Sequence, residues 1–150
     1  MNQKRKVVVA VSGGFDPVHA GHIRHFKEAK KLGDYLVVFL NTDEWLTEKK
    51  GKPFMGFDER KEILESIRYV DEVVRVIDRD DSVALTLELV NPDIFGKGGD
   101  RVKKNLPKSE IDACQRLGIR LVFGVGGGKI QSSSWILSKT VKKQKPQVRM

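Results

Sequence analysis

The stretch that decides the fold is Ser12-Gly13-Gly14-Phe15-Asp16-Pro17-Val18-His19-Ala20-Gly21-His22. It follows an apolar run, residues 7–11, and precedes a series of apolar residues at helical spacing that begins at Ile23. This order predicts a buried strand, a tight turn rich in glycine and then the N-terminus of a helix.

The predicted turn has the features of an anion-binding site. The first turn of a helix presents unpaired backbone N–H groups and a partial positive charge, and both favour a phosphate group. Gly13 and Gly14 allow the backbone to approach a ligand because they carry no Cβ. His19 and His22 are three residues apart, so both lie on one face of that turn. There the two imidazoles can donate hydrogen bonds to phosphate oxygens.

Four further apolar runs predict the remaining strands, at residues 35–40, 73–77, 93–96 and 119–123. Helices are predicted after Asp58 as an N-cap, over residues 107–117 and from Ser132 onward. Residues 82–90 fit a strand or a helix by periodicity, and we choose a helix because the fold needs a crossover there. We interpret residues 42–57 as a loop or short helix followed by a mobile segment.

These elements predict an α/β protein with a Rossmann-like, doubly wound sheet of five parallel strands and helices on both faces. Residues 1–150 form a single domain in this interpretation, with a flexible basic tail over residues 142–150. In such open sheets the ligand lies outside the carboxyl ends of the strands, where the strand order reverses. The predicted turns after strands one, two, four and five all open onto that edge.

Composition and charge limit the classes of partner that the chain is expected to bind. The net charge of +8 suits a polyanion, either a nucleoside triphosphate or a nucleic acid. Much of the excess lies near the two ends of the chain, so we interpret it as solvated tails and do not expect nucleic-acid binding. We expect no membrane segment and a cytoplasmic protein. Cys114 is the single cysteine, which excludes a disulfide framework and a cysteine-based zinc site.

The polar residues of the predicted turns suit phosphoryl chemistry. They supply many donors and positive charges but no nucleophile triad, and phosphoryl transfer needs alignment and electrostatics, usually with Mg²⁺. A Walker-type loop is excluded because Phe123 stands where it needs a glycine and Ile130 where it needs serine or threonine. The dinucleotide fingerprint fails on spacing. We interpret His25 as an ordinary surface or core-edge histidine, and Trp45 and Trp135 as packing residues more than as residues that stack on a nucleotide base.

The run Phe15-Asp16-Pro17-Val18-His19-Ala20-Gly21-His22 resembles the G-x-F-D-P-x-H-x-G-H motif of the cytidylyltransferase-like nucleotidyltransferases. The resemblance implies an enzyme that joins a nucleoside triphosphate to a phosphate-bearing acceptor and releases pyrophosphate. The acceptor phosphate attacks the α-phosphorus in line. His19 and His22 match the motif histidines, which contact the triphosphate and stabilise the transition state.

The resemblance extends to other predicted site residues. Lys49 matches a catalytic lysine, and Lys49, Lys50 and Lys129 are expected to bind substrate. Lys129 lies near the place of an arginine that this chain lacks, and we expect it to substitute. Magnesium is expected to bind through the triphosphate and not through protein ligands. The nucleotide-binding residues implied are Gly14, Phe15, Asp16, His19, Gly21, His22, Arg60, Gly98, Asp100, Ser132, Ser133 and Ser134.

Two subfamilies share features with this chain. Asn41-Thr42-Asp43-Glu44 and residues 68–73 resemble glycerol-3-phosphate cytidylyltransferase, whereas Lys97-Gly98-Gly99-Asp100 resembles the adenylyltransferase that activates heptose 1-phosphate. We favour CTP as the donor and a polyol or sugar phosphate as the acceptor, in a homodimer. The alternatives left open are ATP with a sugar phosphate, a non-catalytic nucleotide sensor, and a basic nucleic-acid-binding domain.

Overall fold

A computed structural model describes residues 5–99 and 105–126 of the chain. Five parallel strands form one sheet in the order β3-β2-β1-β4-β5. The strands are β1 (Val8–Gly13), β2 (Tyr35–Leu40), β3 (Glu72–Arg75), β4 (Ile94–Gly98) and β5 (Arg120–Val125). The predicted five-stranded parallel sheet is therefore confirmed. The strand order reverses beside β1, whose two neighbours are β2 and β4.

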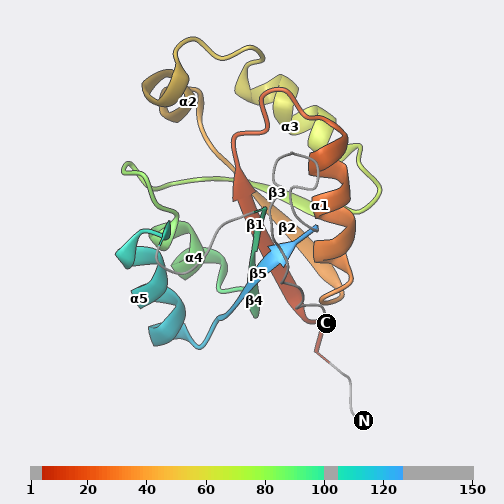
Figure 1. The fold of residues 1–150 in the computed structure, drawn as a ribbon, viewed down its shortest axis with the longest axis vertical. Coiled ribbons are helices and arrows are strands. Elements are labelled where there is room, and N and C mark those ends of the chain that lie inside the picture. The colour runs from red at the N-terminus through yellow and green to blue at the C-terminus, as the bar shows by residue number, and fades with distance from the viewer. Residues whose placement is uncertain (1–4, 100–104, 127–150) are drawn as a thin grey trace, which may run out of the picture.

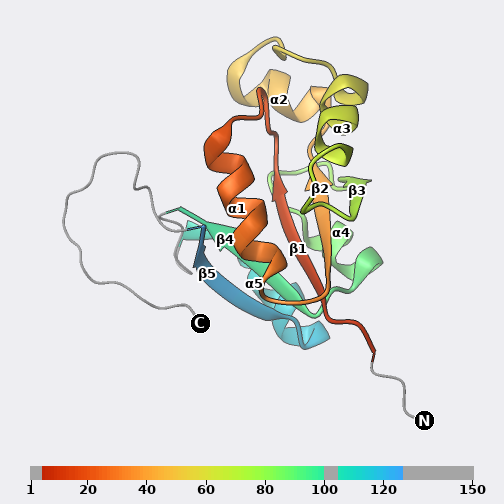
Figure 2. The same ribbon diagram turned by 90° about the vertical axis from the view of Figure 1, so that its right-hand side faces the viewer.

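The described helices are α1 (Ala20–Lys30), α2 (Asp43–Lys50), α3 (Phe57–Glu65), α4 (Ala84–Val90) and α5 (Lys108–Leu117). Helix α1 crosses one face of the sheet, and α4 and α5 lie on the other (Figures 1 and 2). Helices α2 and α3 both fall between β2 and β3, at the end of the sheet where β1 stops (Figure 1). This arrangement confirms the doubly wound class.

Two apolar cores hold the layers together. On one face Phe26 of α1 and Leu64 of α3 pack, fully buried, against β1 and β2. On the other face Leu87 of α4 and Cys114 of α5 pack against residues that include Phe39 of β2. Successive side chains of a strand point to opposite faces, so the apolar run at the start of β1 and the apolar strand β2 contribute side chains to both cores.

Several boundaries differ from the prediction. Helix α3 has Gly56 as its N-cap, and Asp58 lies inside the first turn. Strand β4 continues through Lys97 and Gly98, which we predicted to form a glycine loop. The predicted helix after Ser132 and the tail over residues 142–150 lie outside the described residues. Within the described ranges, no helix has the length and apolar character needed to cross a bilayer.

Candidate active site

A cavity of about 740 Å³ opens at the carboxyl ends of β1, β2 and β4. That volume lies in the range of small-molecule sites, roughly 300–1,000 Å³. The cavity reaches from the glycine turn after β1, across α2, to the start of α5. Its lining includes Gly14, Phe15, Asp16, His19, His22, Asn41, Trp45, Lys49, Lys50, Asp81, Lys97, Asn105 and Glu110. The site is therefore at the edge of the sheet that the strand order predicts.

His19 and His22 meet at the start of α1. Their rings stack with centroids 3.8 Å apart and planes inclined by 26°. His19 is the N-cap of the helix and His22 is the third helical residue, so one turn of helix brings the two rings together. The predicted pairing of these side chains is thus present in the structure.

Backbone hydrogen bonds determine which ring nitrogen carries the proton in each neutral histidine. The N–H of Gly21 donates to Nδ1 of His19 at 3.1 Å, and the N–H of His19 donates to Nδ1 of His22 at 3.2 Å. An imidazole nitrogen that accepts a hydrogen bond cannot itself carry the proton in a neutral ring. Both rings therefore carry their proton on Nε2, which is available to donate to a ligand.

The surroundings of His22 keep its ring neutral. Burial, followed by the neighbouring His19 and His25, lowers the pKa of His22 from 6.5 to about 4. The ring also makes an edge contact with Phe15, with centroids 4.9 Å apart. At neutral pH His22 is therefore an uncharged hydrogen-bond donor and not an imidazolium.

His25 has a different environment. Its Nδ1 lies 2.9 Å from the carbonyl oxygen of Val125, so this nitrogen carries the proton and donates. Burial lowers the pKa of His25 as well. The interpretation of His25 as a core-edge histidine agrees with these contacts.

Arg60 supports the wall of the cavity from behind. Its guanidinium is fully buried and donates to the carbonyl oxygens of Met55, Gly14 and Asn41, each at 2.9 Å, and to the Asp43 carboxylate at 2.7 Å. The prediction that Arg60 contacts the nucleotide does not agree with this placement. The physical reason is that three loop carbonyls and one carboxylate already take its donors.

Asp16 has a similar supporting role. Its carboxylate accepts the backbone N–H groups of Phe54 and Met55, both at 2.7 Å, and its carbonyl oxygen accepts from Lys50 at 2.9 Å. The side chain thereby ties the segment between α2 and α3 to the turn after β1. Asp16 borders the cavity, but its carboxylate oxygens are used in holding this wall together.

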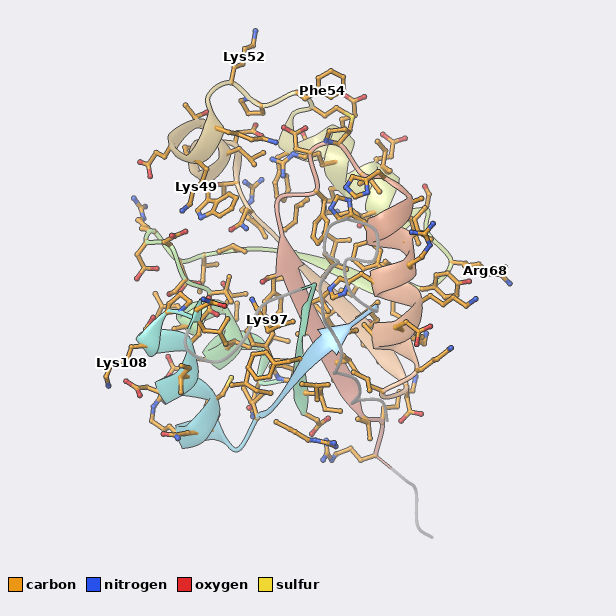
Figure 3. The ribbon with its side chains drawn as sticks, in the orientation of Figure 1. Lys49, Lys52, Phe54, Arg68, Lys97 and Lys108 are labelled. Atoms are coloured by element: carbon orange, nitrogen blue, oxygen red, sulfur yellow. The ribbon has the colours of Figure 1, made fainter. Side chains whose placement is uncertain are left out.

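The two lysines of α2 border the cavity. Lys49 forms an ion pair of 2.7 Å with Asp81, and Figure 3 shows Lys49 on the side of α2 that faces the connection between β3 and α4. Lys52, by contrast, points away from the molecule (Figure 3). The sequence predicted Lys49 and Lys50 at the site but contained no signal for Asp81.

Lys97 and Glu110 border the opposite end of the cavity. Both side chains are more than nine-tenths buried, and Nζ of Lys97 lies 3.9 Å from Oε1 of Glu110. The second carboxylate oxygen of Glu110 accepts the N–H of Val83 at 2.9 Å. The resemblance over Lys97-Gly98-Gly99-Asp100 was a sequence signal for Lys97, whereas Glu110 on its amphipathic helix had none.

The predicted glycines have structural reasons for being glycine. A Cβ at Gly21 would lie 3.0 Å from the His19 ring, so a side chain there would crowd the ring at the N-cap. A Cβ at Gly98 would lie 2.8 Å from Nδ1 of His25. Gly98 therefore packs beneath α1, and the prediction that it belongs to a glycine loop is wrong, since it belongs to β4. Asp100, Lys129 and Ser132, Ser133 and Ser134 lie outside the described residues.

The described residues contain no group of three or more histidine, cysteine, aspartate or glutamate side chains that could hold a metal ion. A metal that enters as a complex with a triphosphate needs no such group, because phosphate oxygens are its ligands. The donor set of this cavity is compatible with that arrangement.

Comparison with known proteins agrees with this geometry. The profile of the cytidylyltransferase-like family matches residues 10–122. Among solved structures, a lipopolysaccharide core biosynthesis protein from Thermoplasma volcanium superposes with a TM-score of 0.67 and 29% identity, over 80% of this chain and 95% of that one.

Curated relatives carry several names. The FAD synthase of Pyrococcus horikoshii is 41% identical over 67% of this chain and 68% of its own length. The glycerol-3-phosphate cytidylyltransferase of Bacillus subtilis is 52% identical over 44% of this chain and 51% of its own. The bifunctional protein HldE of Hahella chejuensis is 36% identical over 80% of this chain and 23% of its own. With the histidine pair at the sheet edge, these matches establish that the chain belongs to the cytidylyltransferase-like family and is a nucleotidyltransferase.

Proposed function

We propose that this enzyme transfers the nucleotidyl group of a nucleoside triphosphate to the phosphate of a small acceptor. A phosphate oxygen of the acceptor forms a bond to the α-phosphorus, the bond from that phosphorus to the β-phosphate oxygen breaks, and pyrophosphate leaves. The observation that carries the proposal is the pair of stacked imidazoles at the border of the cavity, each with Nδ1 occupied by a backbone N–H.

The proposed role of the histidines follows from their protonation. Two Nε2–H groups at the N-terminus of α1 can bind phosphate oxygens and strengthen those bonds as charge develops in the transition state. The helix end adds its own partial positive charge. Because the rings are held by the backbone before the nucleotide arrives, little reorganisation is needed during the reaction.

Lysines supply the mobile positive charge in this proposal. Lys49 and Lys50 border the same cavity as the imidazoles, from the last turn of α2. We propose that Lys49 contacts the triphosphate as it reacts and that Lys50, which already donates to Asp16, steadies the wall beside it. A bound Mg²⁺ would neutralise phosphate charge, and we propose that the triphosphate carries it into the site.

We propose ATP as the first nucleotide to test. FAD synthases match two thirds or more of this chain, and FAD contains an adenylyl group. This preference replaces the expectation of CTP. CTP is the second candidate, favoured by the 52% identity with glycerol-3-phosphate cytidylyltransferase over 66 residues.

The proposed acceptor is a small molecule that carries a phosphate monoester. FAD synthases fit neither the polyol phosphate nor the sugar phosphate expected from the sequence. We therefore add a flavin phosphate as a third candidate acceptor. A homodimer is also part of the proposal, and sedimentation of the full chain tests it separately.

Pyrophosphate release tests the proposal. The full chain is incubated with Mg²⁺, each of ATP, CTP, GTP and UTP, and in turn a flavin, polyol or sugar phosphate. We expect release that requires both an acceptor and either ATP or CTP. The matched control is His22→Asn, which keeps an acceptor for the His19 N–H but has no Nε2. A folded wild-type chain that releases no pyrophosphate with any pair would overturn the proposal.

A further inference from the structure

Two residues of α2 contact one carboxylate across the cavity. Oδ2 of Asp81 lies 2.7 Å from Nζ of Lys49, and its Oδ1 accepts from Nε1 of Trp45 at 3.2 Å. The Lys49 ammonium also lies 5.6 Å from the centre of the Trp45 ring. All three side chains border the cavity. Asp81 therefore links the connection between β3 and α4 to the helix that carries the lysines.

The segment that presents Asp81 is held by its own hydrogen bonds. Asp80 accepts from the backbone N–H and the hydroxyl of Ser82, at 3.0 and 2.9 Å. Asp78 accepts the N–H groups of Leu85 and Thr86 at the start of α4. These hydrogen bonds hold in place the segment from which the Asp81 carboxylate contacts α2.

The ion pair itself is weak enough to exchange. The Lys49 and Asp81 side chains are 45% and 63% exposed, and pairs of this kind contribute up to about 1 kcal/mol. A triphosphate in the cavity would bring several negative charges close to the same ammonium. The Lys49 side chain is long and flexible, so it can leave Asp81 for a phosphate oxygen without movement of the backbone.

Resting on the proposed function, we propose that Asp81 is a positioning residue for Lys49. It holds the ammonium and the Trp45 indole over the cavity in the nucleotide-free protein, and it gives up Lys49 to the phosphates of a bound nucleoside triphosphate. Asp81 is thus a counter-ion that nucleotide must displace.

Substitution of Asp81→Asn separates its contact with Trp45 from its contact with Lys49. The amide oxygen still accepts from Trp45, but the negative charge that competes for Lys49 is removed. The dissociation constants of ATP and CTP, measured by calorimetry on the full chain, should fall about two- to fivefold. Asp112→Asn is the matched control, because Asp112 pairs with Lys108 on the exposed side of α5 and should change neither constant.

A double-mutant cycle shows whether Asp81 acts through Lys49 or only by its charge. In a Lys49→Ala background, Asp81→Asn should no longer tighten binding. An equal gain in both backgrounds would overturn the inference, since a general charge effect would explain it. Unchanged or weaker binding by Asp81→Asn in the wild-type background would also overturn it.

Trp45 provides a second readout. With Trp135→Phe it is the one tryptophan of the chain. We expect nucleotide to change the Trp45 emission, and Asp81→Ser, which shortens the acceptor, to reproduce part of that change without nucleotide. If neither nucleotide nor Asp81→Ser changes the Trp45 emission, the inference is overturned but the proposed function is not. A wild-type chain that binds no nucleotide at all overturns both.

Discussion

The histidine end and the lysine end of the cavity are built in different ways. At the histidine end, backbone N–H groups of α1 hold both rings and determine their protonation. At the lysine end, Lys49 is held by a half-exposed ion pair that one competing anion can break. In the proposed function, the donors for the transition state are therefore fixed in advance, whereas the lysine charge that accompanies nucleotide binding is free to move.

Removal of Nε2 at the histidine end should have the largest effect. His19→Asn and His22→Asn keep an acceptor near the Nδ1 position but have no Nε2–H, so kcat should fall about 10²–10³-fold with little change in the free energy of unfolding. Gln at the same positions retains a distal N–H and should recover part of the rate. Pyrophosphate release measures the effect. Losses below about threefold in both Asn variants would contradict the assigned role.

The next effect concerns Arg60, the buried residue that supports the wall of the cavity. Arg60→Met removes the partner of three loop carbonyls, and buried groups without partners cost about 1–3 kcal/mol each before the loops relax. We expect the free energy of unfolding to fall by about 2–3 kcal/mol in urea titrations. Arg116→Met, which removes an exposed ion pair with Glu88, is the control and should change it by less than about 1 kcal/mol. Equal effects of the two variants would show that Arg60 is not a buried support.

Lys49→Ala should have a smaller effect than the histidine variants. The contact that Lys49 gains with the phosphates of bound nucleotide replaces its ion pair with Asp81, so the nucleotide KM should change little, whereas kcat should fall about tenfold because the ammonium binds the transition-state charge more strongly. Lys52→Ala is the control, because Lys52 points away from the molecule (Figure 3). A rise in KM with unchanged kcat would instead show that Lys49 contributes to nucleotide binding alone and not to the reaction step.

The last expected effect concerns how the free energy of unfolding changes with pH. The pKa of His22 is lowered from 6.5 to about 4 by folding, so the unfolded chain binds the proton more tightly. This contribution to stability is complete above about pH 6.5 and is lost as the pH falls toward 4. His22→Asn should therefore flatten the decline in the free energy of unfolding between pH 6.5 and 4.5, with His25 responsible for part of what remains. An identical slope in the variant would contradict the neutral state of His22.

The sequence predicted the fold well because apolar runs and turn residues are local signals. β1 begins with an apolar run and β2 is apolar throughout, and α4 was assigned correctly from the need for a crossover. The pairing of His19 and His22 also followed from their spacing. These features depend on residues close together in the chain.

The errors concern contacts between distant residues. Arg60 resembled a nucleotide ligand, but its burial depends on carbonyls contributed by three separate loops. Trp45 was interpreted as a packing residue, and it borders the cavity with a hydrogen bond to Asp81, 36 positions away. No motif marks Asp81 or Glu110, because their roles arise only when α2, α4 and α5 converge at the sheet edge.

The most direct test of the central claim is ¹⁵N NMR of the three histidines in the full chain at neutral pH. The account predicts protons on Nε2 of His19 and His22 and on Nδ1 of His25, with ATP or CTP shifting only the two Nε2–H signals strongly. Protons on Nδ1 of His19 or His22, or Nε2–H signals that do not respond to either nucleotide, would contradict it.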